Sequence, residues 1–363
     1  MKAKKTQETR YVGIDLGKRT YELAIAEKGE VKISNGKTCA AGRQALYKKL
    51  RANDKAALEA GNLAFITAKE IQASVGCRVY VLNPSHLPLI YGSMKKTDKE
   101  DSLKLAHIVE DFSEERLPVV PVPSEKEMER RKLLASYRRA QQSRIRDINK
   151  LHGLFLAQGI TTMVKEDLAT GESRKEAVSI LSGSEKEEAE YLVECLDLHE
   201  KRIRVLKGRI KKESAGDEVI QRLQSVPGVG PMVAFAFVSH VGAERFENGS
   251  QVSNYLGLVP RVYISGETVR YGRITKRGNG YLRALLVQAA WALTRTKKGG
   301  KLKARYEYMT IEKSISKKKA IVAIARRLSE LLYTLMKNGT RYEEREFRPG
   351  KGAEKLAEMA LSA

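Results

Sequence analysis

The sequence is poor in cysteine and in long apolar runs. Only three of its 363 residues are cysteines, Cys39, Cys77 and Cys195, and no two form a C-x-x-C pair. This excludes a disulfide framework and a zinc knuckle, and it is typical of a reducing cytoplasm. No apolar run approaches the roughly 18–20 residues that span a bilayer. The basic start, residues 1–5, lacks the apolar core of a signal peptide, so we expect a cytoplasmic protein without a membrane partner.

Acidic residues are scarce relative to basic ones. The chain has 67 lysines and arginines against 44 aspartates and glutamates, a formal net charge of +23. Residues 217–363 hold 26 basic and 13 acidic residues, and therefore +13 of that total. A field of this sign attracts polyanions, of which nucleic acid is the most common in a cell. We therefore expect contact with DNA or RNA rather than basicity that only aids solubility.

Composition divides the chain into five segments. Residues 1–10 are a basic N-terminal segment, and residues 11–124 are a first domain that ends in a linker with three prolines, residues 117–123. Residues 125–216 lack proline and are rich in charged helix formers, which predicts a helical hairpin. We expect residues 217–342 to form a mainly helical domain and residues 343–363 to form a mobile tail.

The first domain has the pattern of an α/β fold. Strands are expected at residues 11–15, 21–26, 30–34, 56–59 and 78–82, and helices at 42–52 and 64–75. Three strands, one helix and then alternating strands and helices is the order of a ribonuclease-H-like fold. Residues 12–17 also resemble the first phosphate loop of actin-like ATPases. No Asp-x-Gly-x-Ser/Thr hairpin accompanies that loop, so we rank the ATPase alternative lower.

Four carboxylates stand at the ends of these elements. Asp15 ends the first strand and Glu59 the fourth, and such strand ends line the ligand crevice of an open sheet. Asp98 and Asp101 open a helix three residues apart, so both lie on one helical face at the end that favours anions. Each residue alone would be a turn residue or a helix cap. Together they predict a site for one or two Mg²⁺ ions, which neutralise converging carboxylates and act on a phosphodiester.

The second segment carries a short heptad seam. Its spacing of 4-3-4-3-4 runs through Leu192, Leu196, His199, Ile203, Leu206 and Ile210. An earlier partner helix carries Leu133, Tyr137, Ile145, Ile148, Leu151 and Phe155. The apolar spacing of the two segments predicts an antiparallel coiled coil, in which His199 sets the register rather than binding a ligand.

The last domain holds two candidate nucleic-acid elements. Residues 227–231, Pro-Gly-Val-Gly-Pro, resemble the turn of a helix-hairpin-helix, where Gly228 and Gly230 would let backbone N–H groups reach a phosphate. An ordinary turn between packed helices is the alternative. Ser265 lies in an expected turn and is either a nucleophile or only a turn residue. The cations predicted to bind phosphate here and beside the aspartates are Arg270, Arg273, Lys276, Arg277, Arg283, Lys95 and Lys96.

The motifs occur in an order that resembles one family. They are Gly13-Ile14-Asp15, Glu59, Lys96-Thr97-Asp98-x-x-Asp101, residues 227–231, Leu256-Gly257-Leu258-Val259-Pro260, Ser265-Gly266 and Gly272–Asn279 with Leu282-Arg283. Over about residues 11–335 the chain resembles the DEDD transposases of insertion-sequence family 110, the bridge-RNA-guided recombinases. It departs from their pattern at Ser102, where alanine is common, and at Glu267, where a second glycine is common.

The resemblance implies a RuvC-like N-terminal domain, a coiled-coil insertion and a C-terminal transposase domain. It implies that Asp15, Glu59, Asp98 and Asp101 bind the metal and that Ser265 forms a phosphoserine link to DNA. It further implies donor and target DNA, a structured non-coding guide RNA, and a dimer or tetramer at the nucleoid of a bacterium or archaeon. Two rival functions stay open: a RuvC-type nuclease or junction resolvase without a covalent intermediate, and a non-catalytic architectural binder.

Overall fold

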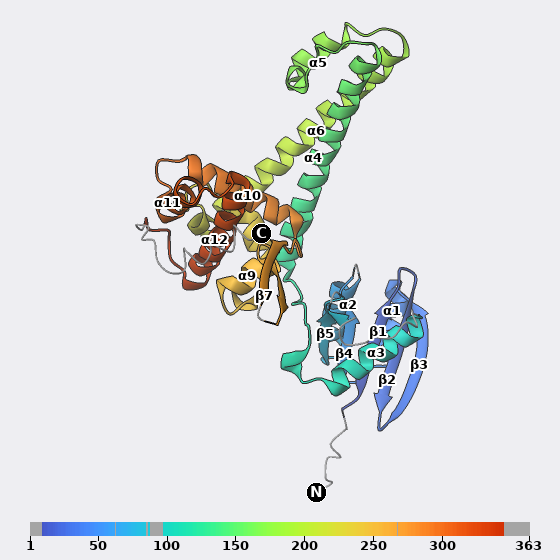
Figure 1. The fold of residues 1–363 in the computed structure, drawn as a ribbon. Coiled ribbons are helices and arrows are strands. Elements are labelled where there is room, and N and C mark those ends of the chain that lie inside the picture. Colours follow the sequence, from blue (N-terminus) through green and yellow to red (C-terminus); the bar gives the residue numbers. More distant parts are fainter. Residues whose placement is uncertain (1–8, 62, 85, 88–96, 267, 345–363) are drawn as a thin grey trace. The chain divides into compact units, whose positions relative to one another are not determined.

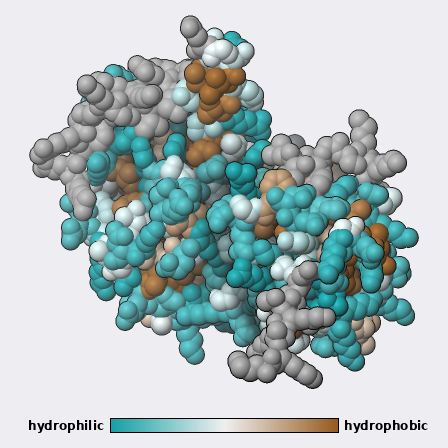
Figure 2. Space-filling model, turned by 90° about the horizontal axis from the view of Figure 1, so that it is seen from below, coloured by the Kyte–Doolittle hydropathy of each residue, from teal (hydrophilic) through white to brown (hydrophobic). Residues whose placement is uncertain are grey.

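The computed structural model describes residues 9–61, 63–84, 86–87, 97–266 and 268–344. The chain divides into two compact units, residues 1–124 and residues 125–363. None of the described helices is long and apolar enough to cross a membrane. On the face drawn in Figure 2 hydrophilic residues predominate, and hydrophobic residues gather only in separate patches.

Unit 1 is built on a five-stranded sheet (Figure 1) with the order β3-β2-β1-β4-β5. The strands are β1 Tyr11–Leu16, β2 Thr20–Glu27, β3 Glu30–Lys37, β4 Lys55–Glu59 and β5 Arg78–Leu82. The first three are antiparallel neighbours, whereas β4 is parallel to both β1 and β5. The expected α/β domain is therefore confirmed, and its sheet is compatible with a RuvC-like fold.

The two faces of this sheet pack against different helices. Helices α1 (Ala40–Tyr47) and α2 (Ala64–Ser74) contribute to a core with the β1 side chains Val12 and Ile14. Helix α3 (Asp98–Asp111) packs on the opposite face, in a cluster with Ala57 of β4. Since side chains alternate along a strand, Gly13 and Asp15 share the face that α3 covers.

The helix expected at residues 42–52 is placed earlier in the chain and ends at Tyr47. A turn replaces its second half, because the Asp54 carboxylate accepts a hydrogen bond from the Arg51 backbone N–H at 2.7 Å. The same carboxylate binds the Arg10 guanidinium through two hydrogen bonds of 2.8 Å. This buried ion pair joins the residue before β1 to the residue before β4, so it anchors the two strands that carry Asp15 and Glu59.

Unit 2 begins with two long antiparallel helices, α4 (Glu125–Ala157) and α6 (Gly183–Ala215), which the short η3 (Lys165–Leu168) and α5 (Gly171–Val178) join at their far end (Figure 1). His199 and Asp147 hydrogen-bond across the pair at 3.0 Å, in line with a register role. Ile145 is 56% exposed, contrary to its expected seam position. Between Tyr137 and Ile148, the residues of α4 at the helical spacing of three and four are instead Ala140 and Arg144. Arg144 forms an ion pair with Glu200 of α6.

The base of this helical hairpin shares one hydrophobic core with the rest of unit 2, which includes Leu133 of α4 and Leu206 of α6. The remaining elements are α7 Glu218–Leu223, α8 Pro231–His240, η4 Ala243–Arg245, α9 Gly249–Tyr255, β6 Pro260–Ser265, β7 Thr268–Ile274, α10 Gly280–Arg295, α11 Gly300–Glu307, the π-helical turn η5 Tyr308–Glu312 and α12 Lys317–Asn338. The sequence predicted helices and turns only, so the β6–β7 hairpin corrects that expectation.

Candidate active site and nucleic-acid interface

The four predicted carboxylates lie at one end of the sheet and on the helix that covers it. Asp15 and Glu59 lie one step beyond the last parallel pair of β1 and β4, Ile14 with Leu58. Asp98 and Asp101 lie in the first turn of α3, whose start is capped by the Thr97 hydroxyl as it accepts from the backbone N–H of Glu100. The sheet and the helix therefore contribute two acids each.

The electrostatics of Asp15 show that these acids share one field. Burial, and then the negative charges of Asp98, Asp101 and Glu59, raise the pKa of the Asp15 carboxyl to about 6. A single carboxylate in a turn would not experience three neighbouring acids, so the structure brings the four residues together. Asp101 is also within 3.3 Å of the Lys104 ammonium one helical turn later, which orients this carboxylate.

The donor set suits a hard divalent cation, because carboxylate oxygens are the ligands that Mg²⁺ takes in proteins. The shared field means that a cation would relieve the repulsion around Asp15. The carboxylates lie farther apart than the ligands of one metal ion would. No group of three or more His, Cys, Asp or Glu side chains among the described residues is close enough to hold a metal ion. Chemistry and electrostatics thus fit a metal, whereas a finished ligand geometry is not present.

Gly13 sets how closely α3 approaches the sheet. A Cβ at this position would lie 1.9 Å from the backbone oxygen of Ser102 and 2.5 Å from the backbone nitrogen of Ala106. The helix therefore rests directly on the β1 backbone, two residues before Asp15. Ser102 itself is fully buried, and its hydroxyl donates to the Lys99 carbonyl within α3. Only glycine at position 13 allows this contact.

We expect the substitution Gly13→Ala to displace α3 and to separate Asp98 and Asp101 from Asp15. Both contacts are with backbone atoms, so they cannot be relieved by a rotamer change, and the cost should reach about 3 kcal/mol in free energy of unfolding. Calorimetry on the full chain measures this loss. The control is Gly61→Ala, since a Cβ there meets nothing nearer than 3.9 Å. Equal melting temperatures for the two variants would contradict the packing argument.

Ser265 lies at the tip of the β6–β7 hairpin. Its cross-strand partner is Thr268, and the next pair on the same face is Tyr263 with Arg270. The residue is exposed, and no described residue hydrogen-bonds to its hydroxyl. The serine therefore projects on a face that also carries a cation. Glu267 lies outside the described residues.

The opposite face of the hairpin is apolar and exposed. Its pairs are Ile264 with Val269 and Val262 with Tyr271. The exposed fractions are 70% for Ile264, 50% for Val262 and 46% for Val269. The strands should have been recognisable in the sequence, because β-branched and aromatic residues flank Ser265-Gly266 on both sides, which is a hairpin signal.

Two of the sequence motifs interlock at the base of this hairpin. The backbone N–H of Thr275 donates to the Val259 carbonyl at 2.9 Å, and a Cβ on Gly257 would lie 2.3 Å from the Arg277 carbonyl oxygen. The Arg283 guanidinium donates to the carbonyls of Leu256 and Arg277 at 2.8 and 2.9 Å. These contacts fix the hairpin base to the start of α10. Arg283 therefore has a structural partner set besides its predicted contact with phosphate.

The other predicted phosphate contacts differ in their surroundings. Arg270 and Arg273 of β7, and Lys276 and Arg277 after it, are exposed. A Cβ on Gly228 would lie 2.5 Å from the Ala289 carbonyl oxygen, so this glycine packs against α10. A Cβ on Gly230, the residue before α8, would have no heavy atom within 4 Å. Of this pair only Gly230 presents an open surface. Lys95 and Lys96 lie outside the described residues.

Comparison with known families covers both units. Residues 12–160 match a family model described as a transposase, of the DEDD type named for IS110. Residues 220–307 match a second model, described as the transposase IS116/IS110/IS902 family. The first match includes the four carboxylates and the second includes the whole β6–β7 hairpin with Ser265.

Curated relatives agree with these models. A protein of Pseudomonas aeruginosa named as a probable family 20 transposase is 28% identical, over 93% of this chain and 98% of its own length. The transposase for insertion sequence element IS1111A of Coxiella burnetii is 27% identical over 72% of each chain. The transposase for insertion sequence element IS1328 of Yersinia enterocolitica is 27% identical, over 77% of this chain and 82% of its own.

Proposed function

Because this chain belongs to the IS110 family of DEDD transposases, we propose that it cuts and exchanges DNA strands at a Mg²⁺ centre held by Asp15, Glu59, Asp98 and Asp101. Membership of the family makes it a transposase, an enzyme that cleaves DNA and transfers its strands. The observation that supports the centre is the shared field of the four carboxylates: burial, and then the charges of the other three acids, raise the pKa of Asp15 to about 6. Four acids at one place are stable only where cations offset their charge.

The residues of the centre would hold the scissile phosphate in a fixed place. Bound Mg²⁺ supplies charge stabilisation for the attacking and leaving oxygens of a phosphodiester. Asp15 and Glu59 provide ligands from the sheet, which is rigid, and Asp98 and Asp101 provide them from the first turn of α3. Since α3 rests on Gly13, any substrate contact that moves this helix also moves two of the four ligands.

Ser265 is the nucleophile in this proposal. Its Oγ forms a bond to phosphorus and its proton passes to water, while the bond from phosphorus to a deoxyribose oxygen breaks and that oxygen takes up a proton from water. The phosphoserine link conserves the energy of the broken bond until a second strand displaces the serine. Arg270 lies one pair away on the same hairpin face, where its guanidinium can bind the non-bridging oxygens. The proposal therefore gives each unit its own role, metal binding in unit 1 and nucleophilic attack in unit 2.

Guide RNA and further copies of the chain belong to the same proposal. The motif set resembles that of RNA-guided recombinases, and residues 217–363 carry a net +13, which favours binding of more than one nucleic-acid strand. We propose that donor and target DNA are selected by a structured non-coding RNA and exchanged within a dimer or tetramer. Strand exchange between two duplexes needs at least two nucleophiles, which two copies of the chain supply.

A metal-dependent nuclease without a covalent intermediate is the second candidate. One observation favours it: among the described residues none, and so no general base, is hydrogen-bonded to the Ser265 hydroxyl. In that case water would be the nucleophile and the hairpin would only bind DNA.

The two functions are separated by trapping the intermediate. The full chain is incubated with DNA that spans the element end, RNA transcribed from its flank, and Mg²⁺, and the reaction is stopped with SDS. We expect a protein–DNA adduct that survives SDS and maps by mass spectrometry to Ser265. Cleavage without an adduct would favour the nuclease, and binding without any cleavage would favour an architectural protein.

A further inference from the structure

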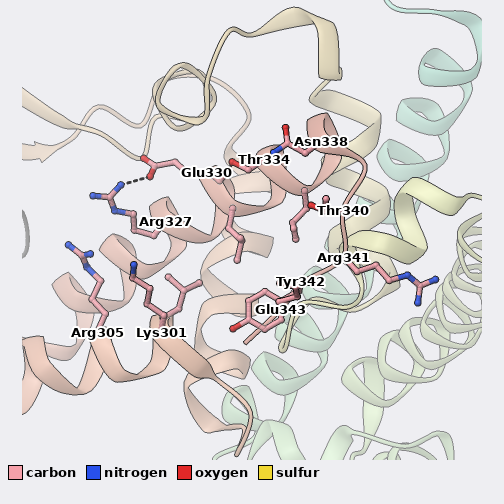
Figure 3. A pocket seen from close by; sticks show the side chains of 13 residues that line it. Lys301, Arg305, Arg327, Glu330, Thr334, Asn338, Thr340, Arg341, Tyr342 and Glu343 are labelled. Atoms are coloured by element: carbon pink, nitrogen blue, oxygen red, sulfur yellow. Dashed lines mark hydrogen bonds and ion pairs between the residues drawn. The ribbon is translucent and has the colours of Figure 1, made fainter. Parts of the chain in front are cut away.

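A basic cavity of about 690 Å³ lies in unit 2, away from the β6–β7 hairpin, between α11, α12 and the segment that follows α12 (Figure 3). Four cations and two carboxylates line it, which leaves a charge of +2. They are Lys301, Arg305, Arg327, Arg341, Glu330 and Glu343. In Figure 3 the charged ends of Lys301, Arg305 and Arg327 lie on one side of the cavity, and Arg341 points to the other.

The Glu330 carboxylate of the cavity already accepts hydrogen bonds from neighbouring side chains. Glu330 accepts from Arg327 at 2.7 Å through one oxygen, and from Arg326 at 3.1 Å and Ser253 at 3.2 Å through the other. The guanidinium of Arg305 makes no hydrogen bond or ion pair with any described residue, although the side chain is half-buried. Burial and the neighbouring positive charge of Arg327 lower the pKa of its guanidinium, and the negative charge of Glu330 offsets this only in part. An anion would therefore be stabilised beside Arg305 more than at an exposed arginine.

The size and walls of the cavity restrict which anion fits. Its volume is within the roughly 300–1,000 Å³ of pockets that enclose a small molecule. The major groove of a duplex is already about 12 Å wide, so a whole duplex could lie only across the mouth. Tyr342 lines the cavity, and the backbone N–H of this residue donates to the Ser225 hydroxyl at 2.8 Å, which anchors it. Cations beside an aromatic ring are the combination that binds single strands.

We propose that this cavity binds a single-stranded stretch of nucleic acid, with a phosphate on Lys301, Arg305 and Arg327 and a base against Tyr342. The lining of this cavity includes neither the four carboxylates nor any residue of the hairpin. It would retain a strand while another part of the same molecule is processed. The proposal rests on the proposed function only in taking the ligand to be nucleic acid.

Binding of labelled oligonucleotides to the full chain tests the site. Fluorescence anisotropy is measured in EDTA, over a series of KCl concentrations, with a 20-nucleotide DNA strand, an RNA strand of the same sequence, and the matching duplex. We expect Arg305→Gln to weaken single-strand binding about tenfold and to lower the salt slope by about 0.7, the contribution of one phosphate contact. Tyr342→Ala should weaken it about tenfold, whereas Tyr342→Phe should not.

The matched control is Lys132→Gln, which removes the same charge from an exposed position on α4, where among the described residues the lysine forms an ion pair with Glu129 alone. Equal affinity and salt slope for Arg305→Gln and Lys132→Gln would overturn the proposal. An equal loss for duplex and single strand would overturn the single-strand assignment. Lys301→Gln provides a second exposed variant if Arg305→Gln melts early.

The two single strands distinguish the source of the ligand. A larger loss with RNA than with DNA assigns the site to the guide, and the reverse assigns it to an unpaired DNA strand. Because the assay contains no Mg²⁺ and measures no strand exchange, its failure leaves the catalytic proposal intact. Conversely, loss of exchange in an Asp15 variant leaves the binding of these oligonucleotides unchanged.

Discussion

Asp15→Asn is expected to lower strand exchange by at least about a thousandfold while making the metal-free protein more stable. The substitution removes one of four ligands and, at the same time, one of four repelling charges. The amide keeps the size of the carboxylate, so the fold should not change. A purely structural role for Asp15 would give the opposite result, a loss of stability together with any loss of activity.

The stability effect has a defined pH range. The folded pKa of Asp15, about 6, is above its ordinary value of 3.8, so folding disfavours the charged form. The native protein therefore loses stability as the pH rises from about 4 to 6, and the deficit is complete above that range. The half-exposed position reduces its size through solvent screening, to about 1–2 kcal/mol. Asp15→Asn removes the deficit at pH 8 and has little effect near pH 4.

Calorimetry of the full chain in EDTA measures the pH dependence of its stability. A second series of measurements is made with Mg²⁺ added. The native chain should gain stability from Mg²⁺ by mass action, and Asp15→Asn should gain much less. Asp111→Asn is the matched control, because this exposed aspartate lies at the other end of α3. A variant that melts earlier than the native chain at pH 8, or one that retains exchange, would contradict the assignment of Asp15.

Ser265→Ala is expected to abolish strand exchange and the SDS-resistant adduct, and to leave Mg²⁺-dependent stability and RNA binding unchanged. The substitution deletes only the hydroxyl that attacks phosphorus, at an exposed position with no hydrogen-bond partner among the described residues. The expected loss is at least about a thousandfold, since water at the same place lacks a positioned nucleophile.

Thr268→Ala is the control for the hairpin itself, because Thr268 is the cross-strand partner of Ser265 and also carries a hydroxyl. We expect this variant to retain exchange and the adduct. A gel assay with end-labelled DNA, together with anisotropy for RNA binding, measures both variants. Full recombination by Ser265→Ala would exclude the nucleophile, and an equal loss in Thr268→Ala would point to the shape of the hairpin instead.

Much of the carboxylate site could be predicted because strand ends and helix starts have local signals. Asp15 lies at the end of an apolar strand, and Asp98 follows the capping Thr97, so each position is defined by its immediate neighbours. The contact between α3 and Gly13 could not be predicted in the same way. It depends on two segments almost ninety residues apart meeting at backbone distance, and the sequence only shows that position 13 is glycine.

The β6–β7 hairpin and the basic cavity are two features that the sequence analysis did not predict. The alternation around Ser265 contains a strand signal, but the charge and the glycines of the segment favour a turn, which is what we expected. The sequence did not predict a site at Lys301, Arg305 and Arg327, because their spacing along the chain matches no motif. Only the packing of α11 on α12 brings these cations together.

The sequence by itself determined the family and the excess of positive charge, and it predicted the four acids and the serine as site residues, because these are properties of residue type and order. Tertiary structure decided which residues share a field and which are committed to structural contacts. It raised the pKa of Asp15 through burial and through three acids from other elements, tied Arg283 to two carbonyls, and left the Arg305 guanidinium without an ion pair among the described residues. The reason is physical: charge and hydrogen bonding depend on distance in space, which residue order does not specify.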